Sequence, residues 1–385
     1  MSAGLVERVR ERLAGAQGAI TPAAVADAVR AEAGGVVSDV DLLSALQLLR
    51  QEFTGAGALE PLLRDPSTTD VLVTGPDAVW VDRGDGLVRT GIGFADDDSV
   101  RRLAQRLALA TGRRLDDACP FVDGRLAGSA VRLHAVLSPP ASGGTCLSLR
   151  VLRPAVDDLP ALLRRRTIDA AADRLLRAVV AARLAFLVSG GAGAGKTTLL
   201  AAMLGCVDPR ERIICVEDAE ELRPAHPHVV RLVTRAPNVE GAGEITLRDL
   251  VRQALRMRPD RLVVGEVRGA EVCDLLSALN TGHDGGAGTV HANSVREVPA
   301  RLEALAGLGG LSPVALHSQL TAAVQVLLHM RREPAGARRL DGVGLLERTS
   351  GGVEVHAVWS HGAGWGSGRE AFGLLLAERG VRLPW

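Results

Sequence analysis

Lys196 is the only lysine among the 45 lysine and arginine residues of this 385-residue chain. It lies in the segment Gly190-Gly191-Ala192-Gly193-Ala194-Gly195-Lys196-Thr197-Thr198. This segment fits the phosphate-binding loop pattern G-x-x-x-x-G-K-[ST], in which glycines let successive backbone N–H groups turn toward one anion. The broad planar fork of arginine cannot replace the compact ammonium of lysine at such a place. The segment therefore predicts a phosphate site, which needs a strand before it and a helix after it.

The flanking residues have the character that a phosphate-binding loop requires. Residues 184–188 are apolar and typical of a buried strand, and residues 197–204 are compatible with a helix. We expect the Lys196 ammonium to bridge β- and γ-phosphate oxygens of ATP, the Thr197 hydroxyl to bind Mg²⁺, and Thr198 to support the α-phosphate side. The alternative, a glycine-rich turn without function, leaves the agreement of strand, loop and helix unexplained.

Composition narrows the partners that the chain can have. Acidic and basic residues balance to a net charge of +0, so no global charge favours nucleic acid or an acidic membrane surface. Aromatic residues make up 2% and tyrosine is absent, which leaves few platforms for stacking bases and argues against a nucleic-acid partner. The cysteines are scattered without a C-x-x-C pair, which argues against a zinc ribbon and a disulfide framework.

Hydropathy predicts a cytoplasmic protein. The first residues carry early charges and no apolar segment of the kind that a secretory signal needs. The longest apolar stretches, near residues 178–188 and 322–328, are interrupted by Arg183 or are shorter than the roughly 18 to 20 residues that span a bilayer. We therefore expect any membrane contact to be peripheral.

The pattern along the chain predicts four parts. Residues 1–60 follow helical spacing and form an N-terminal helical segment. Residues 61–152 combine short strands, including a hairpin over residues 71–81, with a helix, as in a small α/β domain. Residues 153–160 are predicted to be a linker. Residues 161–385 alternate strands and helices around the phosphate loop, which is typical of a doubly wound, mostly parallel sheet.

Finer features are predicted within these parts. Ser99 can cap the helix of the smaller domain, which runs to about Thr111. The end of the chain is predicted to contain further strands and a last helix, for which the sequence suggests no function. These elements are strands near residues 326–330, 340–346 and 353–358 and a helix near residues 369–379.

Hydrolysis of ATP also needs a carboxylate that orients the attacking water and groups that neutralise charge on the γ-phosphoryl. Glu266 ends an apolar run and is our candidate for the water-orienting residue, although the aspartate that commonly holds Mg²⁺ at such a strand end is absent. Glu217 ends a second apolar run and could hold a Mg²⁺-bound water, because strand ends face the ligand crevice in open α/β sheets. His291 follows a small-residue strand and is a third candidate. The alternatives are a salt-bridged glutamate, a solvated acidic run at 217–221 and a structural histidine.

Residues 246–257 are predicted to form an amphipathic helix with a capping box. Its polar side carries Arg248, Arg252 and Arg256. Like charges at this spacing repel one another, so this row is explained if it meets carboxylates or phosphates of another subunit. The alternative is a solvated basic face.

Several further segments carry a family pattern. They are residues 238–241, 246–251, 256–261, 265–269 and 281–294, with residues 65–67 and 112–116 in the smaller domain. Through these segments the chain resembles, from about residue 55, the tight-adherence (Tad/Flp) pilus assembly ATPases of the type II and type IV secretion ATPase superfamily. The resemblance implies a RecA-like P-loop ATPase domain beside a smaller α/β N-terminal domain, with ATP and Mg²⁺ as cofactors.

The resemblance also implies roles for individual residues. Glu217 matches the acidic box of the family, Glu266 its second nucleotide motif, and His291 the histidine that senses the γ-phosphate. Together with Lys196 these are the candidate catalytic residues, and Thr197, Glu217 and Glu266 are the candidate metal residues.

From the smaller domain, Arg125, Arg132 and Arg150 look like the arginines that reach the nucleotide in such enzymes. Ala130 stands where the family carries an arginine, so Arg132 would be a displaced substitute. The family further implies a hexameric ring at the inner face of the cytoplasmic membrane, docked on an inner-membrane platform protein, whose ATP cycle pushes pilin subunits outward.

Two other functions stay open. The first is a conjugation or DNA-transfer motor of the same superfamily, which would be stimulated by DNA with strong salt dependence. The second is a nucleotide-gated scaffold that binds ATP and assembles with little turnover. The retained Lys196, Glu217, Glu266 and His291 favour an active enzyme that powers pilus assembly or protein secretion.

Overall fold

The computed structural model describes residues 55–126, 130–152, 157–238, 241–333 and 336–385, together with residues 12, 27, 28, 31 and 32. Most of the predicted helical segment 1–60, half of the predicted linker and residues 239–240 of one family segment lie outside the described residues. The chain divides into two compact units, Met1–Leu152 and Arg153–Trp385.

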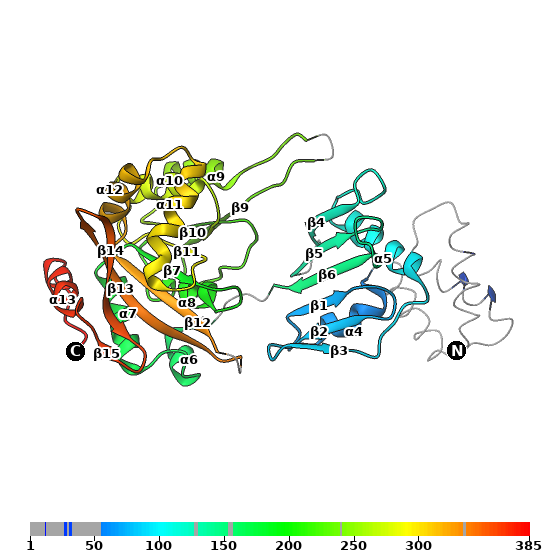
Figure 1. Ribbon diagram of the computed structural model, residues 1–385, viewed down its shortest axis with the longest axis horizontal. Helices are drawn as coiled ribbons and strands as arrows, with labels where there is room; N and C mark the ends of the chain where they lie inside the picture. Colours follow the sequence, from blue (N-terminus) through cyan, green and yellow to red (C-terminus); the bar gives the residue numbers. More distant parts are fainter. Residues whose placement is uncertain are drawn as a thin grey trace. The chain divides into compact units, whose positions relative to one another are not determined.

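The first unit contains a six-stranded antiparallel sheet (Figure 1). Its strands, in spatial order, are β3 (Leu87–Arg89), β2 (Val79–Asp82), β1 (Asp70–Val73), β6 (Cys146–Val151), β5 (Val131–Val136) and β4 (Phe121–Arg125). The helical elements are η1 (Gly57–Leu59), α4 (Glu60–Arg64) and α5 (Asp97–Ala110). The predicted hairpin is confirmed, because β1 and β2 pair antiparallel along their whole length.

Alternation of apolar residues fixes the buried face of this sheet. In β5 the buried positions include Val131, Leu133 and Ala135, and they share one apolar core with Leu103 and Leu107 of α5. The prediction that Ser99 caps this helix is wrong. Asp96 is the N-cap, because its backbone is extended and its side chain accepts a hydrogen bond from the backbone N–H of Ser99, which already lies in the first turn.

The second unit is built on a nine-stranded sheet with the order β15-β14-β13-β12-β7-β11-β10-β8-β9. The strands from β12 to β9 are parallel, whereas β12 to β15 pair antiparallel. Their bounds are β7 (Phe186–Gly190), β8 (Ile213–Glu217), β9 (Val229–Val233), β10 (Arg261–Val267), β11 (Ala287–Val290), β12 (Val326–Arg332), β13 (Arg338–Thr349), β14 (Gly352–Ser360) and β15 (Gly364–Trp365). The predicted doubly wound, mostly parallel sheet is thus confirmed.

Helices cover both faces of this sheet (Figure 1). They are α6 (Leu159–Arg164), α7 (Ala170–Ala181), α8 (Lys196–Leu204), α9 (Leu247–Ala254), η2 (Leu255–Met257), α10 (Glu271–Leu279), η3 (Val295–Glu297), α11 (Val298–Leu308), α12 (Pro313–Ala323) and α13 (Arg369–Glu378). Helix α6 begins at Leu159, so the last two residues of the predicted linker are helical. The strands and the helix predicted near the end of the chain correspond to β12, β13, β14 and α13.

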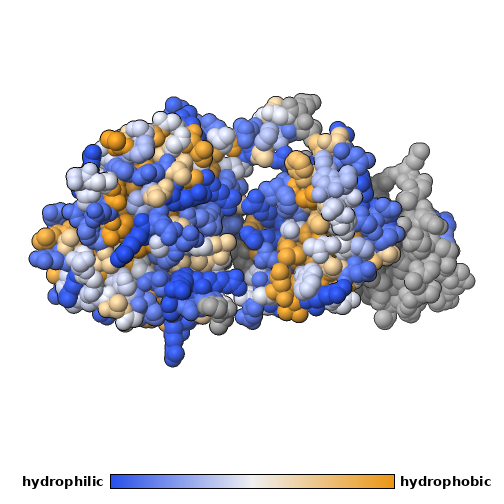
Figure 2. Space-filling view, in the orientation of Figure 1, coloured by the Kyte–Doolittle hydropathy of each residue, from blue (hydrophilic) through white to orange (hydrophobic). Residues whose placement is uncertain are grey.

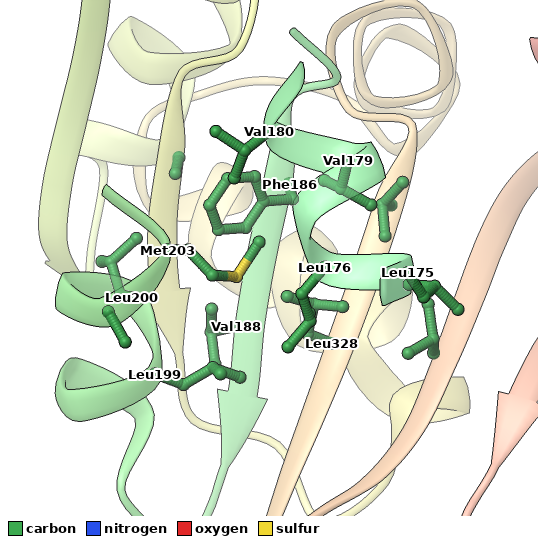
Figure 3. Packing of buried hydrophobic residues seen from close by; sticks show 14 of the residues in the cluster. Leu175, Leu176, Val179, Val180, Phe186, Val188, Leu199, Leu200, Met203 and Leu328 are labelled. Atoms are coloured by element: carbon green, nitrogen blue, oxygen red, sulfur yellow. The ribbon is translucent and has the colours of Figure 1, made fainter. Parts of the chain in front are cut away.

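The central strand β7 shows why the sheet needs helices on both sides. Phe186 and Val188 belong to one apolar cluster, whereas Leu187 between them belongs to the other. Figure 3 shows Phe186 and Val188 packed among residues of α7 and α8, including Val180 and Met203. Each such buried side chain stabilises the fold by about 1.5 to 3 kcal/mol. This packing places the end of β7, and the loop that follows it, at a fixed edge of the sheet.

The surface is mainly hydrophilic in the view of Figure 2, with hydrophobic residues in small patches. Among the residues that the structure describes, no helix is long and apolar enough to cross a membrane.

Candidate nucleotide-binding site

The phosphate loop joins β7 to α8. Gly190 ends β7 with φ at 146°, and a Cβ atom there would lie 2.3 Å from the carbonyl oxygen of Met330 on the neighbouring strand β12. Gly195 precedes α8 in the left-handed conformation, with φ at 93°. Both positions therefore require glycine. The first N–H groups of α8 have no partner inside the helix, which makes this end suited to an anion.

Lys196 is the first residue of α8, and it is buried, with 8% of its surface exposed. Its Nζ atom donates hydrogen bonds to the carbonyl oxygens of Gly190 at 3.0 Å and Gly191 at 2.9 Å. Burial lowers the pKa of Lys196, and the charge of Glu266 partly opposes this effect. Two neutral carbonyl groups hold the ammonium inside the loop. Charged phosphate oxygens are stronger hydrogen-bond acceptors than these carbonyl oxygens.

The imidazole of His291 lies between Lys196 and Glu266. Its Nδ1 atom is 3.5 Å from Lys196 Nζ, and its Nε2 atom is 2.6 Å from Glu266 Oε1. Burial, and then the charge of Lys196, lower the pKa of His291, so the ring is neutral at pH 7. A neutral ring can interact favourably with both neighbours. Its proton is then on Nε2 and faces the carboxylate, and the lone pair of Nδ1 faces the ammonium.

Glu266 lies near the end of β10 and is held by Arg268, whose Nη2 atom donates to Glu266 Oε2. Burial acts to raise the pKa of Glu266, but the hydrogen bond and charge of Arg268, together with the charge of Lys196, lower it below its usual value. The carboxylate is therefore ionised near neutral pH. An ionised carboxylate is what the orientation of an attacking water requires.

Glu217 ends β8 and is buried, with 3% of its surface exposed. Its Oε1 atom accepts hydrogen bonds from the backbone N–H groups of Glu221 and Leu222, at 3.1 and 2.9 Å. The Oε2 atom has no hydrogen-bond partner within the described part of the chain. Burial raises the pKa of Glu217 to about 7, although the two backbone hydrogen bonds oppose this shift. The group thus has an oxygen available to a ligand and changes charge near neutral pH.

The parallel register explains why these side chains share one edge of the sheet. Strand β10 pairs with β8 through Val264 and Val216, and a Cβ atom on Gly265 would lie 2.7 Å from Glu217 Cγ. Strand β11, which precedes His291, pairs with β7 through Val290 and Ser189. The carboxyl ends of β7, β8, β10 and β11 therefore meet at one edge, as expected for the ligand side of a parallel sheet.

The donor set can be tested against Mg²⁺, which prefers oxygen ligands and keeps several waters and phosphate oxygens. Thr197 lies half-buried in the first turn of α8, and Glu217 Oε2 is an unpartnered carboxylate oxygen at the same sheet edge as Glu266. Among the described residues, no cluster of three or more His, Cys, Asp or Glu side chains could hold a metal alone. These residues fit an ion that takes most of its ligands from a nucleotide and water.

Two cavities lie beside the loop. One, of about 640 Å³, is lined by Gly195, Thr198 and Leu199 and by residues of the β12–β13 hairpin. The other, of about 610 Å³, is lined by Gly191, Ala192 and Ala194 and by residues of β12 and of the segment after His291. Space is therefore available at both the Thr198 side and the Gly191 side of the loop.

Two residues at this edge were missed by the sequence analysis. Glu271, at the start of α10, accepts hydrogen bonds from the backbone N–H groups of Arg268 and Gly269, at 2.5 and 2.7 Å. Arg338 of β13 donates from Nε to the carbonyl oxygen of Gly193 at 2.8 Å. Both contacts depend on the fold, and only the Gly265-Glu266 motif near Glu271 gave a local signal.

The three arginines predicted to act from the smaller domain form one row in the first unit. Arg125 of β4 pairs with Arg132 of β5, which pairs with Arg150 of β6. Arg132 also forms an ion pair with Asp123 at 2.7 Å, and Arg150 with Asp70 at 2.9 Å. The fold brings these arginines together, and their contact with a nucleotide stays a prediction.

Two arginines of the basic row, Arg248 and Arg252, have a partner in the same chain that the sequence did not indicate. Arg248 and Arg252 both form ion pairs with Asp274 of α10, at 2.6 and 3.1 Å. Helix α10 packs beside α9 in the same chain, so these two arginines have an internal carboxylate and do not need one from another subunit. The sequence did not reveal this partner because Asp274 is 26 and 22 positions along the chain from Arg248 and Arg252.

The fold and the loop define a RecA-like P-loop protein, and a solved structure of the ATPase DotB from Legionella pneumophila has a similar fold. It is 18% identical, with a TM-score of 0.51, over 74% of this chain and 78% of that one. The model of the type II/IV secretion system protein family matches residues 52–347. The chain belongs to this family.

Curated relatives agree with this assignment. A protein named as a putative conjugal transfer protein from Mycobacterium tuberculosis (strain ATCC 25618 / H37Rv) is 64% identical over 349 residues, which cover 89% of this chain and 99% of that protein. The type IV secretion system protein PtlH of Bordetella pertussis is 33% identical over 73% of this chain and 91% of its own length. These relatives therefore support the assignment of the chain to the type II/IV secretion superfamily.

Proposed function

We propose that this protein hydrolyses ATP to power assembly of a Tad/Flp-type pilus or secretion of protein across the cytoplasmic membrane. The observation that carries the proposal is the contact of three chain segments in one site, where His291 touches both Lys196 and Glu266. A buried ammonium can neutralise phosphate charge and an ionised carboxylate can orient water, which are two roles that phosphoryl transfer to water uses.

In this proposal ATP displaces the internal partners of Lys196. The β- and γ-phosphate oxygens replace the carbonyl oxygens of Gly190 and Gly191 as acceptors from Nζ. The nucleoside would extend past Thr198 into the cavity of about 640 Å³, which is lined by polar groups including Thr167 and His361. Arg125, Arg132 and Arg150 are proposed to contribute positive charge from the first unit.

Glu266 is proposed to orient the attacking water, since its carboxylate is ionised and adjacent to His291. His291 would report the presence of the γ-phosphate because its Nδ1 atom lies beside the Lys196 ammonium that phosphate would attract. Thr197, Glu217 and Glu266 are the residues that would hold Mg²⁺. That ion, when bound, neutralises charge on the β- and γ-phosphate oxygens.

The test is ATP hydrolysis by the purified chain and by Lys196→Ala and Glu266→Gln. Loss of the Lys196 ammonium removes charged hydrogen bonds to phosphate of about 1.5 to 3 kcal/mol each, so nucleotide affinity and turnover should both fall. Glu266→Gln should bind ATP but turn over slowly. Hydrolysis by Lys196→Ala at the parent rate would refute the proposal, and no turnover by the parent with intact binding would favour the scaffold.

We further propose a hexamer that docks on an inner-membrane platform protein, which would localise the chain to the cytoplasmic face of the membrane. Turnover per subunit should then rise with protein concentration as rings form. Glu266→Gln with MgATP should retain a polytopic platform protein and small pilins from native membranes, whereas Lys196→Ala should not.

Conjugation is the second candidate, and the conjugal transfer names of relatives favour it. The same retention experiment distinguishes the two, because a conjugation motor would retain a coupling protein, a relaxase or DNA. It would also show stimulation of ATP hydrolysis by DNA that declines steeply with salt. The zero net charge and the absence of tyrosine count against this candidate.

A further inference from the structure

The hairpin formed by β12 and β13 runs along the outside of the phosphate loop. Strand β12 pairs with β7 up to Met330 and Gly190, and then continues past the end of β7 through Arg331 and Arg332. Strand β13 returns with Arg338, which pairs with Arg332. The sequence analysis found no function for this part of the chain, yet the fold sets it against the loop that binds phosphate in the proposed function.

Arg338 makes two kinds of contact with the loop. Its Nε atom donates a hydrogen bond to the carbonyl oxygen of Gly193 at 2.8 Å. Its side-chain stem lies beside Gly195, because a Cβ atom at Gly195 would be 3.3 Å from Arg338 Cδ. The guanidinium thus meets the middle of the loop while the stem covers its end.

The contact with Gly193 fixes the direction of one peptide group. A trans peptide is planar, so its C=O and N–H bonds point in opposite directions. When the Gly193 carbonyl faces Arg338 outside the loop, the N–H of Ala194 faces the loop interior. In this structure that N–H makes a long, 3.4 Å hydrogen bond to the carbonyl oxygen of Gly191 across the loop. The same carbonyl oxygen accepts from Lys196 Nζ, so the N–H points to an acceptor that phosphate would replace in the proposed function.

We propose that Arg338 is a positioning residue for the phosphate loop. It holds the Gly193–Ala194 peptide with its N–H group turned inward, so that the donor needs no reorientation when phosphate binds. Glycine at 193 has φ at 68° and the internal hydrogen bond of Ala194 N–H is long, at 3.4 Å, so Arg338 adds the shorter, external restraint on this peptide. The inference rests on the proposed function of the loop as an ATP site.

A role through the loop backbone has a distinctive kinetic signature. The inward N–H group would bind phosphate in the ground state and in the transition state alike, so its loss should weaken binding without slowing the chemical step. Arg338→Ala should raise the Kd for MgADP and the KM for MgATP by roughly 10-fold, the size expected for loss of one charge-assisted hydrogen bond, with kcat changed less than about twofold. Arg338→Lys, which keeps a cationic donor, should recover part of the affinity.

The experiment measures MgADP affinity by calorimetry and steady-state ATP hydrolysis for the parent, Arg338→Ala, Arg338→Lys and Arg348→Ala. Arg348 is an exposed arginine near the other end of the same strand and serves as the matched control, which should behave as the parent. Thermal melting of each variant separates loss of affinity from loss of folding. If Arg338→Ala does not fold, the comparison of Arg338→Lys with the control decides.

Three results would overturn the inference. Parent-like affinity in Arg338→Ala would remove the positioning role. A fall in kcat with unchanged Kd would make Arg338 a transition-state contact instead. An equal loss in Arg348→Ala would make the effect one of general strand stability. A parent that binds no MgADP, or Lys196→Ala that binds it equally well, would instead refute the proposed function of the site.

Discussion

His291 and Glu266 come from different strand ends and meet with Nε2 and Oε1 only 2.6 Å apart. This short distance is favourable when a proton lies between the two atoms, which places the imidazole proton on Nε2. The other ring nitrogen is 3.5 Å from Lys196 Nζ. The histidine therefore connects the residue that would bind phosphate to the residue that would orient water.

Arg268 controls the acidity of Glu266. Burial acts to raise the pKa of this carboxyl, and the Arg268 hydrogen bond and charge lead the effects that reverse it. In Arg268→Ala we expect the pKa of Glu266 to rise, so the acidic limb of the kcat against pH profile should move to higher pH. Arg268→Lys keeps the charge and should shift the limb less. If the acidic limb lies at the same pH in all three proteins, Glu266 is not the group whose ionisation produces that limb.

Glu217 links stability to pH in the opposite direction from an ordinary surface carboxylate. Its folded pKa is raised to about 7, above the unfolded value of roughly 4.3, so the folded state holds its proton more tightly. The stabilisation is fully present below the unfolded pKa and is lost as pH rises through about 7. A shift of this size corresponds to at most about 3 to 4 kcal/mol.

Glu217→Gln replaces the group by a neutral amide of the same shape. We expect this variant to melt at a higher temperature than the parent at pH 8 and to differ little at pH 4.5, because the parent carboxyl is charged only at the higher pH. The measurement is a thermal melt across this range. A parent-like pH dependence in Glu217→Gln would assign the titration to another group. If Glu217 also binds Mg²⁺, the same variant should need more Mg²⁺ for hydrolysis.

Asp274 is the partner of the α9 arginines within the same chain. This pairing predicts a different result from a contact of these arginines with another subunit. Asp274→Asn removes the carboxylate shared by Arg248 and Arg252, whose side chains are 41% and 57% exposed. Because solvent screens such pairs, we expect a loss of only about 1 kcal/mol in the free energy of unfolding, with oligomer size unchanged. Sedimentation of the parent and the variant at matched concentration tests this. Loss of assembly in the variant would instead support a contact of these arginines with another subunit.

Local patterns predicted much of the fold and of the site. The phosphate loop is a contiguous motif with required flanks. Glu217 and Glu266 lie at or near the ends of apolar strands and His291 follows one, so their meeting at one sheet edge follows from parallel topology. Arg338 could not be found in this way. Its partner Gly193 is 145 positions away, and nothing near Arg338 in the sequence indicates a loop contact.

The sequence also could not identify which polar side chains are partners of one another. The Asp274 carboxylate is 22 and 26 positions from its two arginines, and the identity of a charge partner depends on how two helices pack. The N-cap at Asp96 shows the same limit at short range, because Asp96 and Ser99 are both good caps and only the backbone conformation distinguishes them.

Arg261 is a buried charge that gives the largest stability prediction. It is 2% exposed and forms an ion pair with Glu211 at 2.7 Å, and its Nη2 atom donates to the carbonyl oxygen of Val180 at 3.0 Å. Arg261→Ala leaves Glu211 with Arg183 as its remaining ion-pair partner and leaves a cavity in place of the buried side chain. We expect a loss of about 3 to 5 kcal/mol, measured as a lower melting temperature and urea midpoint.

The matched control removes both charges of that pair. Arg261→Met combined with Glu211→Leu replaces the ion pair by apolar groups of similar volume, which in buried pairs costs little or even stabilises. We expect the double variant to melt closer to the parent than Arg261→Ala does, and both to keep nucleotide affinity when folded, since the pair lies at the start of β10 and the candidate site lies at its end. A double variant as unstable as Arg261→Ala would mean that the backbone contacts of Arg261, rather than its charge pairing, hold this end of the sheet.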